Sequence, residues 1–168
     1  MARFNTVRLA IYGMPGVELE YTAENPLPEP IKPGMSLHIA STGKVIANPS
    51  ALATDFPNGK LIAVQSDAFG KGVSEDWNET ANDYVADDIV MTQQVRPGDK
   101  IWGWLPPGEI AVVGAPLLMT GGALGYPGTL EVYKAGDEAR YAHILGHSEE
   151  LVDNTAGVDP IRIIAVAW

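Results

Sequence analysis

Three Pro-Gly pairs divide residues 95–130 into short pieces, and this stretch constrains the fold more than any other. The pairs are Pro97-Gly98, Pro107-Gly108 and Pro127-Gly128. Proline presets φ for the second position of a turn, and the glycine that follows accepts the positive φ of a type II turn. The pieces between the turns are apolar, and KIWGWL at 100–105 is aromatic and β-branched. The spacing leaves no room for a long helix, so the stretch predicts a meander of short strands.

Strand patterns recur along the rest of the chain. Residues 6–12 and 17–21 alternate between apolar and other side chains, a period of two that is typical of strands. The first of these belongs to an N-terminal arm, residues 1–12, which either forms a hairpin with the second or pairs with another chain. Further strands are expected at 35–39, 44–47, 61–64, 89–94, 110–113, 115–118, 131–133, 141–147 and 161–166.

The fold class follows from these elements. Residues 25–33 (NPLPEPIKP) hold four prolines and predict an extended crossing, not a helix or a central strand. A chain of 168 residues is long enough for one core. We therefore predict a single all-β domain over residues 1–168, a small antiparallel barrel or sandwich with long loops and little helix.

Residues 67–88 differ in character from the rest of the chain, because they are polar and acidic. We predict a long surface loop with one helical turn at 75–77. Loops of this length are uncommon in a compact domain, and they usually serve as a lid, a contact or an insertion. The carboxylates leave a calcium site open, although their spacing does not follow the EF-hand pattern.

The charge of the chain limits its partners. It carries 11 Lys and Arg against 21 Asp and Glu, a formal net charge of −10. Phosphate backbones and anionic membrane surfaces repel such a domain, which argues against nucleic acid or a membrane as a partner. The chain has no cysteine, which removes disulfides and thiolate metal sites. No apolar run approaches the ~20 residues of a membrane span, and we see no secretory signal. We expect a soluble protein that is made in the cytoplasm.

The sequence holds no recognisable catalytic or metal-binding motif. His143 and His147 are four residues apart, a spacing that brings ligands together on a helix but leaves them roughly 13 Å apart on the strand expected here. The adjacent carboxylates Asp87-Asp88 and Glu149-Glu150 point to opposite faces of a strand and indicate a solvated acidic surface. HExxH, Walker and GxSxG motifs are absent. We assign no catalytic, cofactor-binding or metal-binding residue.

Two tryptophans stand out in the central stretch. Trp102 and Trp104 are two residues apart, so a strand places them on one face. Such a pair forms either a core or subunit-interface contact, which we favour, or a platform on which a sugar stacks.

A series of short motifs follows in order from residue 32 onward. They are KPGMSL (32–37), TGKV (42–45), LIAVQ with DAFG (61–70), VRPGDKI (95–101), LPPGE (105–109), GAPL (114–117), GTL (128–130), HIL (143–145) and RIIAV (162–166). In this order they resemble the capsid decoration, or cement, proteins of tailed bacteriophages. The cores of those proteins repeat Pro-Gly-Asp, an apolar strand, Gly, Ala-x-Leu and Gly-x-Leu.

The resemblance implies a β domain of the tulip or barrel kind on the exterior of a virion. Such a protein is structural, not an enzyme, and needs no cofactor. It implies binding to the major capsid protein, as a homotrimer at local three-fold sites of the head. An N-terminal strand can add to an exposed sheet edge of a capsid subunit. The expected contact residues are Phe4, Val7, Leu9 and Ile11 of the arm, together with Trp102 and Trp104.

Two other functional classes stay open. One is a carbohydrate-binding or adhesin-like β module, with Trp77, Trp102 or Trp104 as the stacking surface. The other is a β-barrel hydrolase or isomerase with His143 or His38 as its base, a reading that lacks an identifiable catalytic partner.

Overall fold

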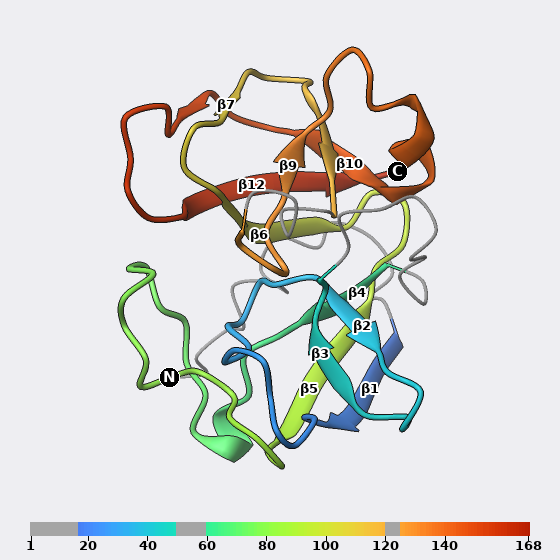
Figure 1. Cartoon of the computed structure of the whole chain (residues 1–168), viewed down its shortest axis with the longest axis vertical. Helices are drawn as coiled ribbons and strands as arrows, with labels where there is room; N and C mark the ends of the chain where they lie inside the picture. Colours follow the sequence, from blue (N-terminus) through green and yellow to red (C-terminus); the bar gives the residue numbers. More distant parts are fainter. Residues whose placement is uncertain (1–16, 50–59, 120–124) are drawn as a thin grey trace.

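The structure is a computed structural model that describes residues 17–49, 60–119 and 125–168. Two β-rich halves stack along its longest axis (Figure 1). Strands β1 to β5 build the lower half, and strands β6 to β12 build the upper half. Within these ranges, none of the helical segments has the length and apolarity to cross a bilayer.

The lower half consists of two antiparallel sheets. In one, β5 lies between β1 and β4. In the other, β2 pairs with β3. The bounds are β1 Val17–Thr22, β2 Leu37–Ile39, β3 Val45–Ala47, β4 Leu61–Ala63 and β5 Ile89–Gln94. A short 3-10 helix, η1 (Asp67–Phe69), opens the long loop between β4 and β5.

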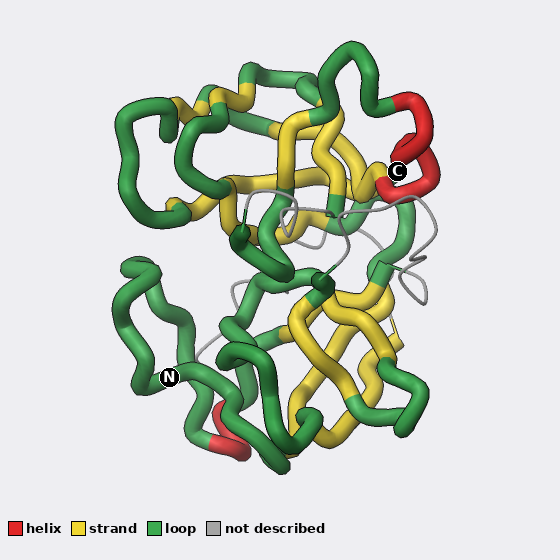
Figure 2. The backbone as a smooth tube through the Cα atoms, in the orientation of Figure 1, coloured by secondary structure: helices red, strands yellow, loops and turns green. Residues whose placement is uncertain are grey.

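The upper half contains a five-stranded antiparallel sheet in the order β6-β12-β10-β8-β9 and a small sheet of β7 and β11. The bounds are β6 Lys100–Leu105, β7 Ile110–Ala111, β8 Pro116–Leu118, β9 Glu131–Val132, β10 Ile144–Ser148, β11 Val152–Asp153 and β12 Ile161–Ala167. A second 3-10 helix, η3 (Glu138–His143), precedes β10. Figure 2 shows how little of the described chain is helical.

Strand β4 contributes to two hydrophobic cores. Leu61 and Ala63 belong to the core of the lower half, whereas Ile62 and the following Val64 belong to the core of the upper half. A strand that is buried on both faces must be apolar throughout, and this explains the sequence LIAV. Strand β6 also reaches both cores, because its Trp104 packs in the lower one. The two halves therefore share the strands at their junction.

The structure confirms the prediction of an all-β chain. Its sheets are open, and none closes into a barrel within the described ranges. The three Pro-Gly pairs form turns, and Gly98, Gly108 and Gly128 have φ of 92°, 83° and 77°. The predicted N-terminal arm, with Phe4, Val7, Leu9 and Ile11, lies outside the described residues.

Three local predictions were wrong. Residues 141–143 belong to η3 and not to a strand, and β10 begins only at Ile144. Val112 and Val113 follow β7 in a turn in which the Ala115 N–H donates to the Val112 carbonyl at 2.9 Å. β-branched residues favour strands only weakly, so a turn contact overrides them.

The third correction concerns the long loop. Its helical turn lies at 67–69 instead of 75–77, and the loop is not wholly on the surface. Ser74, Asp83 and Tyr84 are buried. Asp83 and Tyr84 are buried because this part of the loop packs back onto the 25–33 segment, where Tyr84 and Ile31 exchange backbone hydrogen bonds of 2.8 and 3.0 Å.

Candidate functional site

Arg162 on β12 connects the two halves of the molecule. Its Nε and Nη2 donate to the Ser74 carbonyl at 2.9 and 2.6 Å. Its Nη1 donates to the carbonyls of Pro33 and Trp102 at 3.0 and 2.9 Å. The planar guanidinium presents its donors in a rigid fork, so one side chain holds the long loop and the 25–33 segment against β6.

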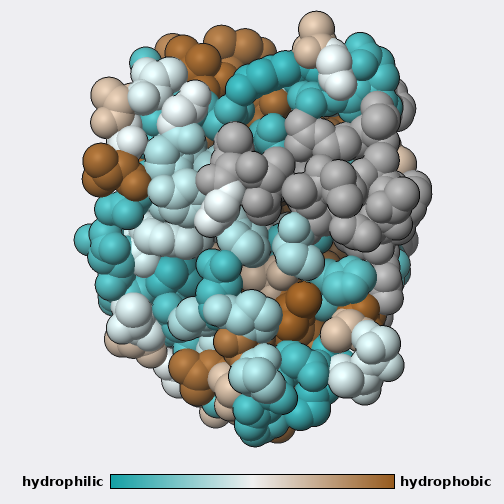
Figure 3. Space-filling view, viewed as in Figure 1, coloured by the Kyte–Doolittle hydropathy of each residue, from teal (hydrophilic) through white to brown (hydrophobic). Residues whose placement is uncertain are grey.

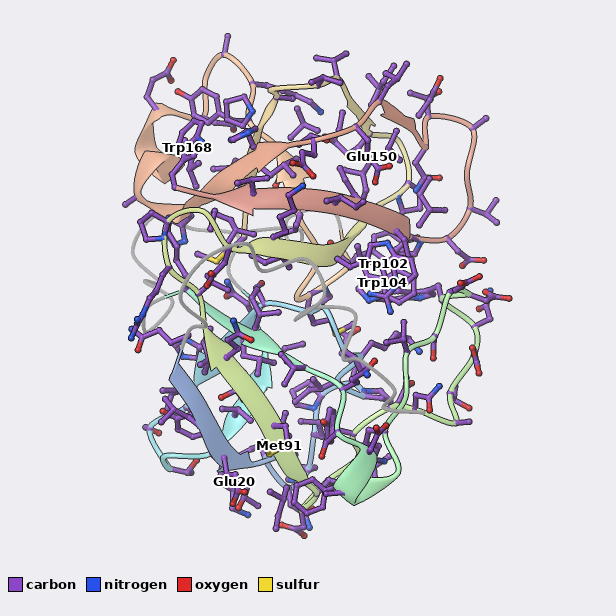
Figure 4. The ribbon with its side chains drawn as sticks, turned by 180° about the vertical axis from the view of Figure 1, so that it is seen from behind. Glu20, Met91, Trp102, Trp104, Glu150 and Trp168 are labelled. Atoms are coloured by element: carbon purple, nitrogen blue, oxygen red, sulfur yellow. The ribbon has the colours of Figure 1, made fainter. Side chains whose placement is uncertain are left out.

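The same guanidinium stacks on two indole rings. Its Cζ lies 3.7 Å from the ring centroid of Trp104 and 4.9 Å from that of Trp102, and both tryptophans stand at the junction of the halves (Figure 4). Burial lowers the pKa of Arg162 to about 9. The side chain is therefore still protonated at neutral pH, and a cation over an aromatic face is attracted by the ring quadrupole.

Trp102 and Trp104 differ in burial, which bears on whether they form a core contact, a subunit contact or a sugar-stacking platform. Trp104 is fully buried, and its indole N–H donates to the Pro33 carbonyl at 3.1 Å. It is a core residue of a single chain, with no exposed face for a sugar or a second subunit. Trp102 is half-buried, with Arg162 on its ring.

Trp77, in the long loop, is the tryptophan of this cluster that lines a surface pocket. Its ring is nearly perpendicular to that of Trp104, with centroids 5.2 Å apart, and to that of Tyr126 at 6.2 Å. These are edge-to-face geometries that aromatic pairs favour. The Nζ of Lys32 lies 5.4 Å from the Trp77 ring centroid. The indole is thus held in place by neighbours and remains half-buried.

A buried ion pair joins the proline-rich segment to the long loop. The Nζ of Lys32 lies 2.8 Å from both carboxylate oxygens of Asp83 and donates to the Glu79 carbonyl at 3.0 Å. Both side chains of the pair are almost completely buried. Burial raises the pKa of Asp83, while the hydrogen bond and charge of Lys32 oppose that rise. The pair fixes the relative position of the two segments.

Two adjacent hollows lie along the line where these segments meet. The first, of about 360 Å³, is lined mainly by apolar side chains, namely those of Pro26, Leu27, Pro30, Val85 and Ala86. The second, of about 240 Å³, is bounded by Trp77 and by polar side chains, among them Glu29, Lys32, Thr80 and Asp83. Pro30 lines both. We call the two together the double hollow.

The double hollow lies in the most acidic part of the molecule. Residues 67–88 contain seven acidic residues and one lysine, which gives this loop a net charge of −6 out of −10 for the chain. Within the described chain, the Glu29 carboxylate has no hydrogen-bond or ion-pair partner, and burial raises its pKa. An unpaired carboxylate in a half-buried position favours a cationic partner.

A second exposed feature lies at the far end of the upper half. Four aliphatic side chains of the β7–β11 region are exposed by 46 to 69%: Ile110, Val112, Val113 and Leu151. Figure 3 shows hydrophobic residues gathered at the top of the molecule, where Figure 1 places the β7 loop. We call these four residues the aliphatic patch. Contiguous exposed apolar surface of this kind marks interaction sites.

The histidines form no cluster. His143 is buried, while His147 accepts a hydrogen bond of 2.7 Å from the indole N–H of Trp168. His38 lies on β2. Across the described ranges, no three His, Asp or Glu side chains come together as metal ligands, and this includes the loop considered for calcium.

The adjacent carboxylates take part in contacts within the chain. Asp87 and Asp88 pair with Lys44 and Lys71 at 3.0 Å. Glu149 pairs with Lys100. Such ion pairs at the surface contribute little to stability, and they leave no converging pair of carboxylates in this group.

Sequence reasoning missed the Lys32–Asp83 pair, Glu29 and the role of Arg162. One signal was present, because Arg162 is the only charged residue in the apolar strand IRIIAVA. A lone charge in a core strand is usually paired or hydrogen-bonded.

Comparison of the chain with protein-family models and with curated proteins found no match.

Proposed function

We propose that the chain is a structural virion protein, a decoration protein that binds the outer surface of a phage head and stabilises the shell. It acts as a homotrimer at local three-fold sites and contacts the major capsid protein. The proposal assigns it no catalytic activity and no cofactor. Its support is the order of turn and strand motifs, together with a body in which the charged side chains of Arg162, Lys32 and Asp83 hold its own segments together.

The aliphatic patch is the observation that carries the proposal. A protein that bridges subunits of a shell needs contact surfaces on more than one side, and many identical contacts stabilise the assembly cumulatively. Copies of a chain with net charge −10 repel one another. Contact between copies is therefore best made where the surface is aliphatic, as it is at Val113 and Leu151. The acidic lower half then remains for a different partner.

Sedimentation equilibrium and cosedimentation with heads test this proposal. The heads are undecorated shells assembled from the major capsid protein of the phage whose genome encodes this chain. We expect the wild type to sediment as a trimer, three times the 17.9 kDa of one chain, and to bind the heads. Val113→Asp in the aliphatic patch should yield monomers. Val158→Asp is the matched control, because Val158 is 81% exposed on another loop.

A wild-type protein that does not bind the heads would reject the proposed function. A trimer that survives Val113→Asp would reject the role of the aliphatic patch and leave the function in place.

A carbohydrate-binding module is the second candidate, and one observation favours it. Trp77 lines a pocket together with a carboxylate, an amide and a hydroxyl group, the kinds of group that bind sugars beside an aromatic ring. Methyl glycosides that quench the tryptophan fluorescence of the wild type, and not of Trp77→Leu, would support this candidate. An unchanged spectrum with both proteins would argue against it.

A further inference from the structure

The double hollow has walls that are held in place before any partner arrives. At one end, the Asn25 side chain donates to Asp87 at 2.5 Å. At the other end, the backbones of Ile31 and Tyr84 exchange two hydrogen bonds, and the Lys32–Asp83 pair follows directly. Contacts at both ends fix the proline-rich segment against the loop. A preformed surface loses little conformational entropy on binding, and so it retains more of its interaction energy as affinity.

The larger hollow suits an aliphatic side chain. Two of its walls are prolines, Pro26 and Pro30, and Leu27, Val85 and Ala86 complete the apolar lining. Val85 is 52% exposed, so a guest side chain that covers it removes apolar surface from water. Burial of that surface is favourable by about 25 cal/mol per Å².

The smaller hollow suits a cation. Glu29 places an unpaired carboxylate beside the Trp77 ring, and carboxylates and indole faces both attract ammonium and guanidinium groups. Lys32 does not oppose this, because Asp83 neutralises it through two contacts of 2.8 Å. The indole already accepts the Lys32 ammonium at 5.4 Å, which shows that the site tolerates positive charge.

The electrostatic field around the double hollow also favours a positively charged ligand. The loop that forms one wall carries seven acidic residues and one lysine. Two of the acidic residues, Asp83 and Asp87, pair with Lys32 and Lys44 from outside the loop, which leaves a net charge of −4. Exposed charges act over about 8 Å at physiological salt, and so the loop attracts a basic segment and repels another copy of this acidic chain. Charge complementarity of this kind raises association rates and selects partners.

We propose that the double hollow binds a segment of the major capsid protein that presents an aliphatic side chain next to a lysine or arginine. The aliphatic side chain enters the hollow between Pro26 and Val85, and the cation lies between Glu29 and Trp77. This inference rests on the proposed function and specifies which surface faces the shell and the chemistry of its contact.

Glu29→Gln tests the inference, with Glu20→Gln as the matched control. Both substitutions remove one negative charge and keep the shape of the side chain. Glu20 is exposed on β1 and lines neither hollow (Figure 4). Cosedimentation with undecorated heads gives the dissociation constant of each protein between 50 and ~300 mM NaCl, a range that screens exposed charges. We expect Glu29→Gln to weaken binding about tenfold at low salt, as the loss of one charge-assisted contact predicts.

The salt series and a second variant separate the two hollows. Binding of the wild type and of Glu20→Gln should weaken as salt rises, and binding of Glu29→Gln should weaken less. Val85→Ser should lower the affinity at every salt concentration, whereas Val158→Ser, at a residue outside both hollows, should not. Val85 and Glu29 are partly exposed, so neither substitution is expected to unfold the protein. Equal thermal midpoints check this expectation.

The outcomes distinguish this inference from the proposed function. Heads that bind all variants equally would overturn the inference and leave the function standing. Heads that bind none of the proteins, including the wild type, would remove both. Binding that methyl glycosides abolish, and that neither salt nor Glu29→Gln alters, would assign the pocket to a glycan and overturn the inference.

Discussion

Replacing Arg162 by methionine tests whether one side chain holds the two halves of the protein together. Methionine is long and flexible enough to occupy the space against the indoles of Trp102 and Trp104, but it offers no donor. The substitution therefore removes the hydrogen bonds to Ser74, Pro33 and Trp102 and leaves most of the apolar packing.

The expected loss of stability follows from these contacts. The buried Ser74 carbonyl loses both of its guanidinium donors, and a buried acceptor without a partner costs ~1–3 kcal/mol. The Pro33 carbonyl keeps the indole N–H of Trp104. Loss of the cation–π contacts costs up to ~2 kcal/mol at a desolvated site, and relief from burying a charge offsets part of the total. We expect the free energy of unfolding to fall by about 3 kcal/mol, which is a large share of the 5–15 kcal/mol typical of a domain.

Urea unfolding followed by tryptophan fluorescence measures this loss. Arg96→Met is the matched control, because Arg96 is exposed, and surface substitutions usually change stability by less than ~0.5 kcal/mol. Hydrogen exchange gives a second readout. The substitution Arg162→Met should increase the exchange rate of the amides of residues 67–88, relative to the wild type, more than it increases that of the β12 amides. The reason is that the loop loses its anchor at Ser74.

Two results would refute this reasoning. One is an Arg162→Met protein whose unfolding free energy matches that of Arg96→Met. The other is a destabilised Arg162→Met protein in which the loop and β12 exchange at equally increased rates, because that pattern indicates general loss of packing and not the release of an anchored loop.

Three further predictions concern other parts of the fold. Asp83→Asn leaves the buried Lys32 without its counter-charge and should lower the free energy of unfolding by about 3 kcal/mol. This is the lower end for a broken buried pair, and we choose it because burial already raises the pKa of Asp83. A loss below ~1 kcal/mol in urea unfolding would contradict this. Gly146→Ala drives a Cβ into the backbone carbonyl of Val166 on β12 and should prevent correct pairing of β10, which circular dichroism and solubility would report; a folded protein of wild-type stability would count against it. The hydrogen bonds of Asp87 to Lys44 and Asn25 lower its pKa from 3.8, so its stabilising effect is present above pH 3.8 and is lost as pH falls through the lower pKa of the folded state. Asp87→Asn should therefore make stability less dependent on pH below 3.8, and an unchanged acid profile would rule this out.

Much of the fold was accessible from local sequence. Proline followed by glycine produced the turns at Gly98, Gly108 and Gly128, because φ preferences act within two residues. Alternation located β1, in which Leu19 and Tyr21 are half-buried while Glu20 and Thr22 are exposed. The prediction failed at 141–143, where a 3-10 helix replaces the expected strand, because tertiary context can override weak local preferences.

The candidate site was not accessible in the same way. Lys32 and Asp83 are 51 residues apart in the chain, and Arg162 lies 88 residues from Ser74. Neither pairing has a local signature, and the acidic loop read alone predicted a solvated surface. The loop folds back only because its partners lie on distant segments.

The sequence by itself determined that this protein is a turn-rich β chain with a strongly acidic loop, because turn chemistry, alternation and charge are properties of neighbouring residues. Tertiary structure alone decided that Trp104 is core, that Arg162 ties the two halves together, and that Glu29 and Trp77 share a pocket. These contacts depend on which segments meet in space, and their energies arise only when burial removes the groups from water.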